Sequence, residues 1–120
     1  MARLRILALS AAAALTAGAA WAHHGWSTYS DAESQVSGVV ESAELGAPHG
    51  VLKVRAADGV WNVVLAPPAA IERSGLTLVA IPKGTQVTAK GHKRIDGARE
   101  IKTERLVVGA KTYDLYPARS

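Results

Sequence analysis

Two adjacent histidines, His23 and His24, are the residues of this chain whose types and spacing most directly suggest chemistry. They follow Ala20-Trp21-Ala22, which places small residues at the first and third positions before a secretion-signal cleavage site. Cleavage after Ala22 gives His23 a free amine beside two imidazoles. Such a nitrogen donor set suits Cu(II), Ni(II) or Zn(II), and copper stands highest in the affinity series of the divalent metals.

A metal site here needs a third donor, and His49 in the Pro48-His49-Gly50 turn is the best candidate. With cleavage after Ala22, the amine and imidazole of His23 chelate one metal, and His24, His49 or His92 completes the set. Cleavage one residue earlier makes His24 the third residue after a free amine, a spacing suited to square-planar Cu(II) or Ni(II). If the arm instead folds back, His24 and His49 meet without the amine.

Simpler interpretations of the same histidines stay open. His23 and His24 also suit a solvated chain start, and His49 suits a plain turn whose ring bonds a backbone carbonyl. His92 stands beside Lys93 and Arg94, whose charges oppose a bound cation. The sequence therefore predicts a metal site of His23, His24 and His49, for copper or another divalent metal such as zinc or nickel, and no organic cofactor.

The first 22 residues have the parts of a signal peptide. Arg3 and Arg5 precede an apolar stretch over residues 6–19, and the Ala20-Trp21-Ala22 site follows. A membrane anchor is the competing interpretation, but the apolar stretch is shorter than the roughly 20 residues of a spanning helix. We therefore expect a signal peptide over 1–22, a periplasmic or secreted protein, and no membrane span after cleavage.

Composition excludes several classes of protein. The chain has no cysteine, which rules out disulfides, thiolate metal sites and cysteine nucleophiles. Its net charge of +4 falls by two when Arg3 and Arg5 are removed with the signal, and no concentrated basic patch remains for nucleic acid. The carboxylates form no obvious pair, and no Ser-His-Asp order or phosphate loop stands out. We expect a protein that is not an enzyme and does not bind nucleic acid.

The elements that position these residues are mostly strands. Residues 23–35 read as an extended arm, and 36–117 as a single domain with turns at Asp58-Gly59 and Asp96-Gly97. Pro68 or Ala69 begins a short helix that Gly75 ends. Strands are expected over 35–43, 51–56, 60–65, 86–92 and 100–108, with a terminal strand over 111–116. This order predicts an all-β fold with one short helix, a small five- to six-stranded OB-like Greek-key barrel.

With these segments in place, the chain resembles a family of short exported bacterial proteins that form a domain of unknown function. The resemblance rests on Ala22-His23-His24-Gly25-Trp26, on Ser37-Gly38-Val39 in the first strand, and on the Pro48-His49 turn. Trp61, Arg73-Ser74-Gly75 and the segment from Ile81 to Gly91 extend it. Ala47 and Thr85 stand where the family has asparagine and aspartate. The resemblance implies export and a small β-domain, and it implies no reaction.

Two functions follow as expectations. The first is an exported, non-enzymatic barrel that binds a small ligand, a divalent metal such as copper, through the N-terminal histidines. The alternative is an envelope interaction module that binds a partner protein or glycan, with the histidines incidental. Trp61 is expected in the core. Trp26 is expected to pin the arm against the barrel and so to fix where His23 and His24 point.

Overall fold

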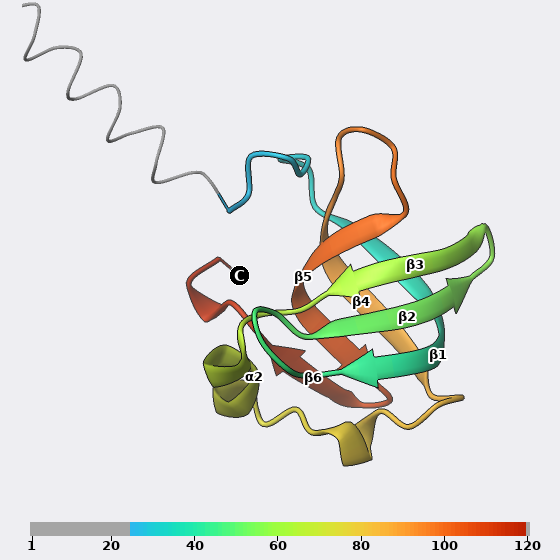
Figure 1. Cartoon of the computed structure of the whole chain (residues 1–120), viewed down its shortest axis with the longest axis vertical. Helices are drawn as coiled ribbons and strands as arrows, with labels where there is room; N and C mark the ends of the chain where they lie inside the picture. Colours follow the sequence, from blue (N-terminus) through green and yellow to red (C-terminus); the bar gives the residue numbers. More distant parts are fainter. Residues whose placement is uncertain (1–24, 120) are drawn as a thin grey trace, which may run out of the picture.

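The structure is a computed structural model, and it describes residues 25–119 (Figure 1). Between residues 25 and 119, six strands and one α-helix follow one another in the order that the turns and alternation predict. Their bounds are β1 (Ser34–Glu44), β2 (Val51–Ala56), β3 (Gly59–Val64), α2 (Pro68–Ser74), β4 (Gln86–Lys93), β5 (Glu100–Val108) and β6 (Lys111–Asp114), with 3-10 turns η1 (Leu78–Ala80) and η2 (Pro117–Arg119). The expected all-β fold with one short helix is confirmed.

The strands close into a five-stranded barrel with one strand added. The sheet order is β3-β2-β1-β4-β5-β6, and β3 also pairs in parallel with β5 through Asn62↔Glu100 to Val64↔Lys102. This parallel pairing joins β3, at one end of the sheet, to β5, the last strand but one, so that β1, β2, β3, β5 and β4 form a ring. β6 pairs with β5 outside the ring, and α2 lies in the connection between β3 and β4.

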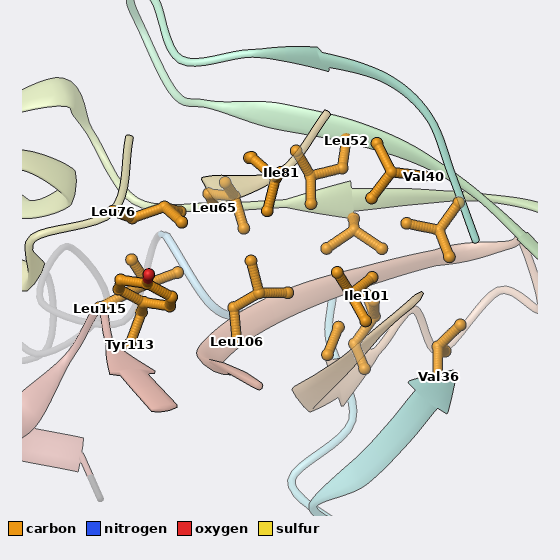
Figure 2. Packing of buried hydrophobic residues seen from close by; sticks show 14 of the residues in the cluster. Val36, Val40, Leu52, Leu65, Leu76, Ile81, Ile101, Leu106, Tyr113 and Leu115 are labelled. Carbon is orange, nitrogen blue, oxygen red and sulfur yellow. The ribbon is translucent and has the colours of Figure 1, made fainter. Parts of the chain in front are cut away.

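The core fills the inside of this barrel (Figure 2). Alternate residues of β3 point inward and Leu65, just after the strand, continues the alternation, so that Trp61, Val63 and Leu65 share the buried face that the sequence predicted. Trp61 is 7% exposed and belongs to the core, as expected. Ile71 anchors α2 on the same cluster, and Gly75 ends that helix in the left-handed conformation. Burial of these apolar side chains is what holds a domain without disulfides together.

Gly38 has a different role from the bulge that its position in a strand suggests. The register shift of β1 lies between Val40 and Ser42 instead. A Cβ at Gly38 would stand 2.2 Å from the Arg55 carbonyl oxygen, so glycine is required there for close approach of two backbones. A strand glycine signals either feature, and the sequence alone does not separate them.

The described part of the arm is less extended than predicted. Residues 25–28 form a turn, in which the Tyr29 amide donates to the Trp26 carbonyl at 3.1 Å. Tyr29 then forms a bridge with Arg94 beyond β4, and β1 begins at Ser34, two residues before the predicted start of the domain. Among residues 25–119, no helix combines the length and apolarity needed to cross a bilayer.

Candidate functional site

Of the three predicted metal ligands, one lies in the part of the chain that the structure describes. His23 and His24 fall outside it. His49 lies in the loop between β1 and β2, after a cis Ala47-Pro48 bond, and is half-buried. Its ring forms no hydrogen bond with residues 25–119, so the backbone bond that a plain turn would give it is absent there. Those residues contain no group of three His, Asp or Glu side chains able to hold a metal.

Trp26, two residues after His24 in the sequence, packs closely against the barrel. Its ring meets His92 edge-on at 5.8 Å and Tyr116 at 5.2 Å between centroids. The Arg119 guanidinium lies 3.8 Å from the ring centroid, and the Lys102 ammonium lies 4.6 Å from it. Two cations on one indole are favourable because the ring faces carry negative potential. Trp26 therefore pins the arm to the barrel, as the sequence predicted.

Backbone pairing holds the next residues of the arm against the end of β4. The Ser30 amide donates to the Lys93 carbonyl at 2.8 Å, and the Ile95 amide donates to the Thr28 carbonyl at 3.1 Å. These bonds continue the β4 edge beyond the strand itself. The arm is thus attached at its aromatic side chain and along its main chain.

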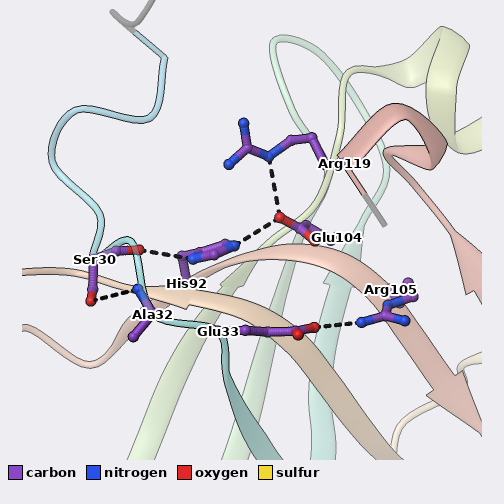
Figure 3. A network of polar contacts seen from close by, with 7 residues as sticks. All are labelled: Ser30, Ala32, Glu33, His92, Glu104, Arg105 and Arg119. Carbon is purple, nitrogen blue, oxygen red and sulfur yellow. Dashed lines mark hydrogen bonds and ion pairs between the residues drawn. The ribbon is translucent and has the colours of Figure 1, made fainter.

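His92 connects the arm to β5 (Figure 3). It is 8% exposed; its Nδ1 lies 2.8 Å from the Ser30 carbonyl oxygen, and its Nε2 lies 2.8 Å from Glu104 Oε1. The carbonyl only accepts, so Nδ1 carries a proton, and a second proton must lie between Nε2 and the carboxyl. Both ring nitrogens are therefore occupied, which leaves no lone pair for a metal. His92 is a structural residue.

Glu104 links His92 to the C-terminal segment. The residue is 3% exposed, and the same Oε1 accepts a hydrogen bond from Arg119 Nε at 3.2 Å. A carboxylate this deeply buried requires charged or hydrogen-bonded partners, and here it has one on each side. Arg119 thus holds Glu104 through its Nε (Figure 3) and packs its guanidinium on Trp26, so that the C-terminal segment contacts the arm.

Lys102, on β5, binds the start of the arm. Its ammonium donates to the Gly25 carbonyl at 2.7 Å and also lies 5.7 Å from the centre of the Tyr29 ring. Burial lowers the pKa of Lys102, and the positive charge of Arg119 lowers it further. The first described residue of the chain is therefore held by a buried cation with a weakened hold on its proton.

Tyr29 adds a second polar attachment. Its hydroxyl donates to Glu100 Oε2 at 2.7 Å. Burial, and then the hydrogen bond to that carboxylate, raise the pKa of Tyr29 to about 12. Arg94 forms ion pairs with Glu100, at 3.6 Å, and with Asp96, at 2.7 Å. The hydrogen bond from Arg94 is the main reason that the pKa of Asp96 is lowered to about 2.

Sequence reasoning identified Trp26 as an anchor and weighed His92 only as a disfavoured metal donor; it did not identify Lys102, Glu104 or Arg119. In the sequence, Lys102 and Glu104 are two more charges on a strand, which normally indicates a solvated face. Their position opposite the arm depends on pairing of residues far apart in the chain. The sequence held one weak signal of their burial. Lys102 and Glu104 alternate with Ile101 and Thr103 along β5, and this strand has a neighbour on each side.

Comparison with known sequences adds one finding. No curated protein matches this chain. A family described as "Family of unknown function (DUF6152)" matches residues 11–103, a range that includes all four histidines and ends just before Glu104. Since the match covers well over half of the 120 residues, the chain belongs to this family of unknown function.

Proposed function

We propose that this protein is an exported, non-enzymatic β-barrel that binds a divalent metal ion, copper above all, through His23 and His24 at the start of its processed chain. His49 is the proposed third ligand. The proposal concerns a protein without its first 22 residues, and it assigns the barrel the task of supporting a short metal-binding terminus. A periplasmic or secreted location follows from the same cleavage.

The attachment of Gly25 and Trp26 is the observation that carries the proposal. Lys102 holds the Gly25 carbonyl, and Trp26 is packed by five side chains, those of Tyr29, His92, Lys102, Tyr116 and Arg119. Any residue that immediately precedes Gly25 therefore starts from a fixed point on the barrel. A fixed start reduces the conformational entropy that ligand binding has to overcome.

The nature of the donors supports copper over harder cations. Amine and imidazole nitrogens are neutral ligands that suit Cu(II), Ni(II) and Zn(II). Calcium and magnesium take carboxylate oxygens, and the carboxylates nearest the attachment, Glu104 and Glu100, are already engaged by Arg119 and Tyr29. His49 adds a half-buried ring that is free of hydrogen bonds to residues 25–119.

The test is a Cu(II) titration of the processed protein, after its N-terminus has been identified by intact mass. We expect a one-to-one complex that is weakened at least tenfold in His23→Ala and His24→Ala, and lost when the terminal amine is blocked. His49→Ala reports whether the third ligand is correct. Val79→Ala is the control, because that side chain is 89% exposed and takes no part in the attachment of the arm. Affinity no higher than that of an unstructured His-His peptide would favour the alternative interaction module.

A further inference from the structure

The C-terminal segment, residues 116–119, lies against the N-terminal arm, although the two stand at opposite ends of the described chain. It follows Leu115, which is 1% exposed and belongs to the core, and it includes the turn η2. Beyond that core anchor, Tyr116 meets the Trp26 ring edge-on at 5.2 Å between centroids. The Arg119 guanidinium lies 3.8 Å from the centre of the same ring. Two side chains of the segment therefore pack on the aromatic anchor of the arm.

A second connection between the two ends runs through buried polar groups (Figure 3). Arg119 Nε donates to Glu104 Oε1 at 3.2 Å, and His92 Nε2 lies 2.8 Å from the same oxygen. The other ring nitrogen of His92 lies 2.8 Å from the carbonyl oxygen of Ser30, which belongs to the arm. Glu104 thus stands between a residue that holds the arm and a residue of the C-terminal segment.

The exposure of these side chains shows where the connection can open. The side chains of Glu104 and His92 are 4% and 10% exposed, whereas that of Arg119 is 41% exposed. When Arg119 leaves, the buried carboxylate keeps His92 as its partner but loses a full positive charge, which is unfavourable for a charge out of water. Detachment of the arm uncovers His92 and lets water reach the pair. Departure of Arg119 therefore favours departure of the arm.

Lys102 supplies a force that opposes the attachment of Arg119. Its ammonium lies 4.6 Å from the centre of the Trp26 ring, on which the Arg119 guanidinium also packs. The positive charge of Arg119 is, after burial, a cause of the lowered pKa of Lys102. Like charges at such short range repel each other. Trp26 and Glu104 therefore hold Arg119 against a repulsion, and this repulsion lowers the cost of opening the contact.

We propose that the C-terminal segment is a latch on the N-terminal arm, so that the two dock on the barrel together and detach together. In the docked state Arg119 binds Trp26 and Glu104; in the detached state both ends are released and water reaches Glu104. Each end then stabilises the other by the same coupling free energy. The latch itself requires no metal. Its consequence for metal binding, a looser start of the processed chain when the segment is released, rests on the proposed function.

The test measures each end in a variant of the other end, by NMR and without metal. Arg119→Ala should raise amide hydrogen exchange at Ser30 about fivefold or more, while the Val40 amide inside the barrel keeps its rate. Conversely, Trp26→Ala should speed exchange of the Arg119 Nε–H proton, which donates to Glu104. Arg119→Lys should recover part of the protection at Ser30, because an ammonium still pairs with the carboxylate but lacks the planar guanidinium that packs on the ring.

Arg73→Ala is the matched control, because it removes an exposed arginine of α2 and should leave exchange at Ser30 unchanged. Unchanged exchange at Ser30 in Arg119→Ala, or at the Arg119 Nε–H in Trp26→Ala, would overturn the proposal, since each end would then be held without the other. An equal rise at Val40 would overturn it by showing that the whole domain loosens. In the double variant the latch predicts an effect smaller than the sum of the single free-energy changes, and a full sum would mean that the two ends act independently. Failure of the Cu(II) titration alone would leave the latch standing.

Discussion

Replacing Trp26 by alanine should release the arm while the barrel stays folded. The ring is packed by two cations, Arg119 at 3.8 Å and Lys102 at 4.6 Å from its centroid, and by the edges of His92 and Tyr116. Each cation contact contributes roughly 0.5–1 kcal/mol, and each ring contact about 0.5 kcal/mol at a half-exposed position. The variant should therefore lose about 2 kcal/mol of arm attachment.

Amide hydrogen exchange measures this loss locally. About 2 kcal/mol corresponds to roughly a 30-fold rise in the population of the detached arm. The Ser30 and Ile95 amides report that state directly, since each donates across the junction between the arm and β4. The Val40 amide, which donates to the Thr85 carbonyl inside the barrel, should keep its exchange rate.

Two results would refute this reasoning. Unchanged exchange at Ser30 and Ile95 would mean that backbone pairing alone holds the arm, and an equal rise at Val40 would mean that the arm and barrel unfold together. Val79→Ala removes a side chain that is 89% exposed and serves as the control with no expected effect. If the metal proposal also holds, Trp26→Ala should weaken Cu(II) binding, because the ligands then start from a mobile point.

Three further outcomes are expected. The Tyr29 attachment should contribute about 1 kcal/mol to the free energy of unfolding, after allowance for solvent screening. Because the folded state raises the pKa of Tyr29, this contribution should be complete below pH 10, the ordinary phenol pKa, and be lost as the pH rises toward about 12. Denaturation of Tyr29→Phe should show no such loss at alkaline pH. Gly38→Ala should lower the free energy of unfolding by at least about 3 kcal/mol, because its Cβ would collide with the Arg55 carbonyl oxygen. Gly46→Ala, whose Cβ would have no atom within 4 Å, should leave the midpoint of urea unfolding nearly unchanged. Lys102→Met should loosen the start of the arm, because its ammonium holds the Gly25 carbonyl, and so raise amide hydrogen exchange at Ser30; an unchanged exchange rate would show that this contact does not hold the arm.

Local signals explain why the elements were predictable from the sequence. The Asp58-Gly59 turn, the alternation in residues 100–108 and the proline and glycine around residues 68–75 each act within a few residues. The structure accordingly has β2 at Val51–Ala56, β5 at Glu100–Val108 and the helix at Pro68–Ser74. Turn chemistry and side-chain period determine such features without help from the rest of the chain.

The attachment site was only half predictable because it depends on contacts across the whole fold. Trp26 was recognised as an anchor from its size in a polar arm, but its partners come from β4, β5 and the C-terminal segment. Glu104 becomes buried only once His92 and Arg119 lie on either side of it. The parallel pairing of Asn62 with Glu100, which closes the barrel, likewise has no local signal in either segment.

The positive charges around Trp26 constrain any metal bound immediately before Gly25. Lys102 and Arg119 both lie on the ring that anchors this point, and Glu104 is buried between His92 and Arg119 rather than presented to solvent. A cation held by weak oxygen ligands gains too little there to offset the repulsion. Copper bound by an amine and imidazoles gains more per ligand. Since burial already lowers the pKa of Lys102, a bound metal should lower it further, so that Lys102 loses its proton, and with it the repulsion, at a lower pH when metal is bound. Metal affinity should therefore rise with pH beyond the range in which the histidine ligands lose their own protons.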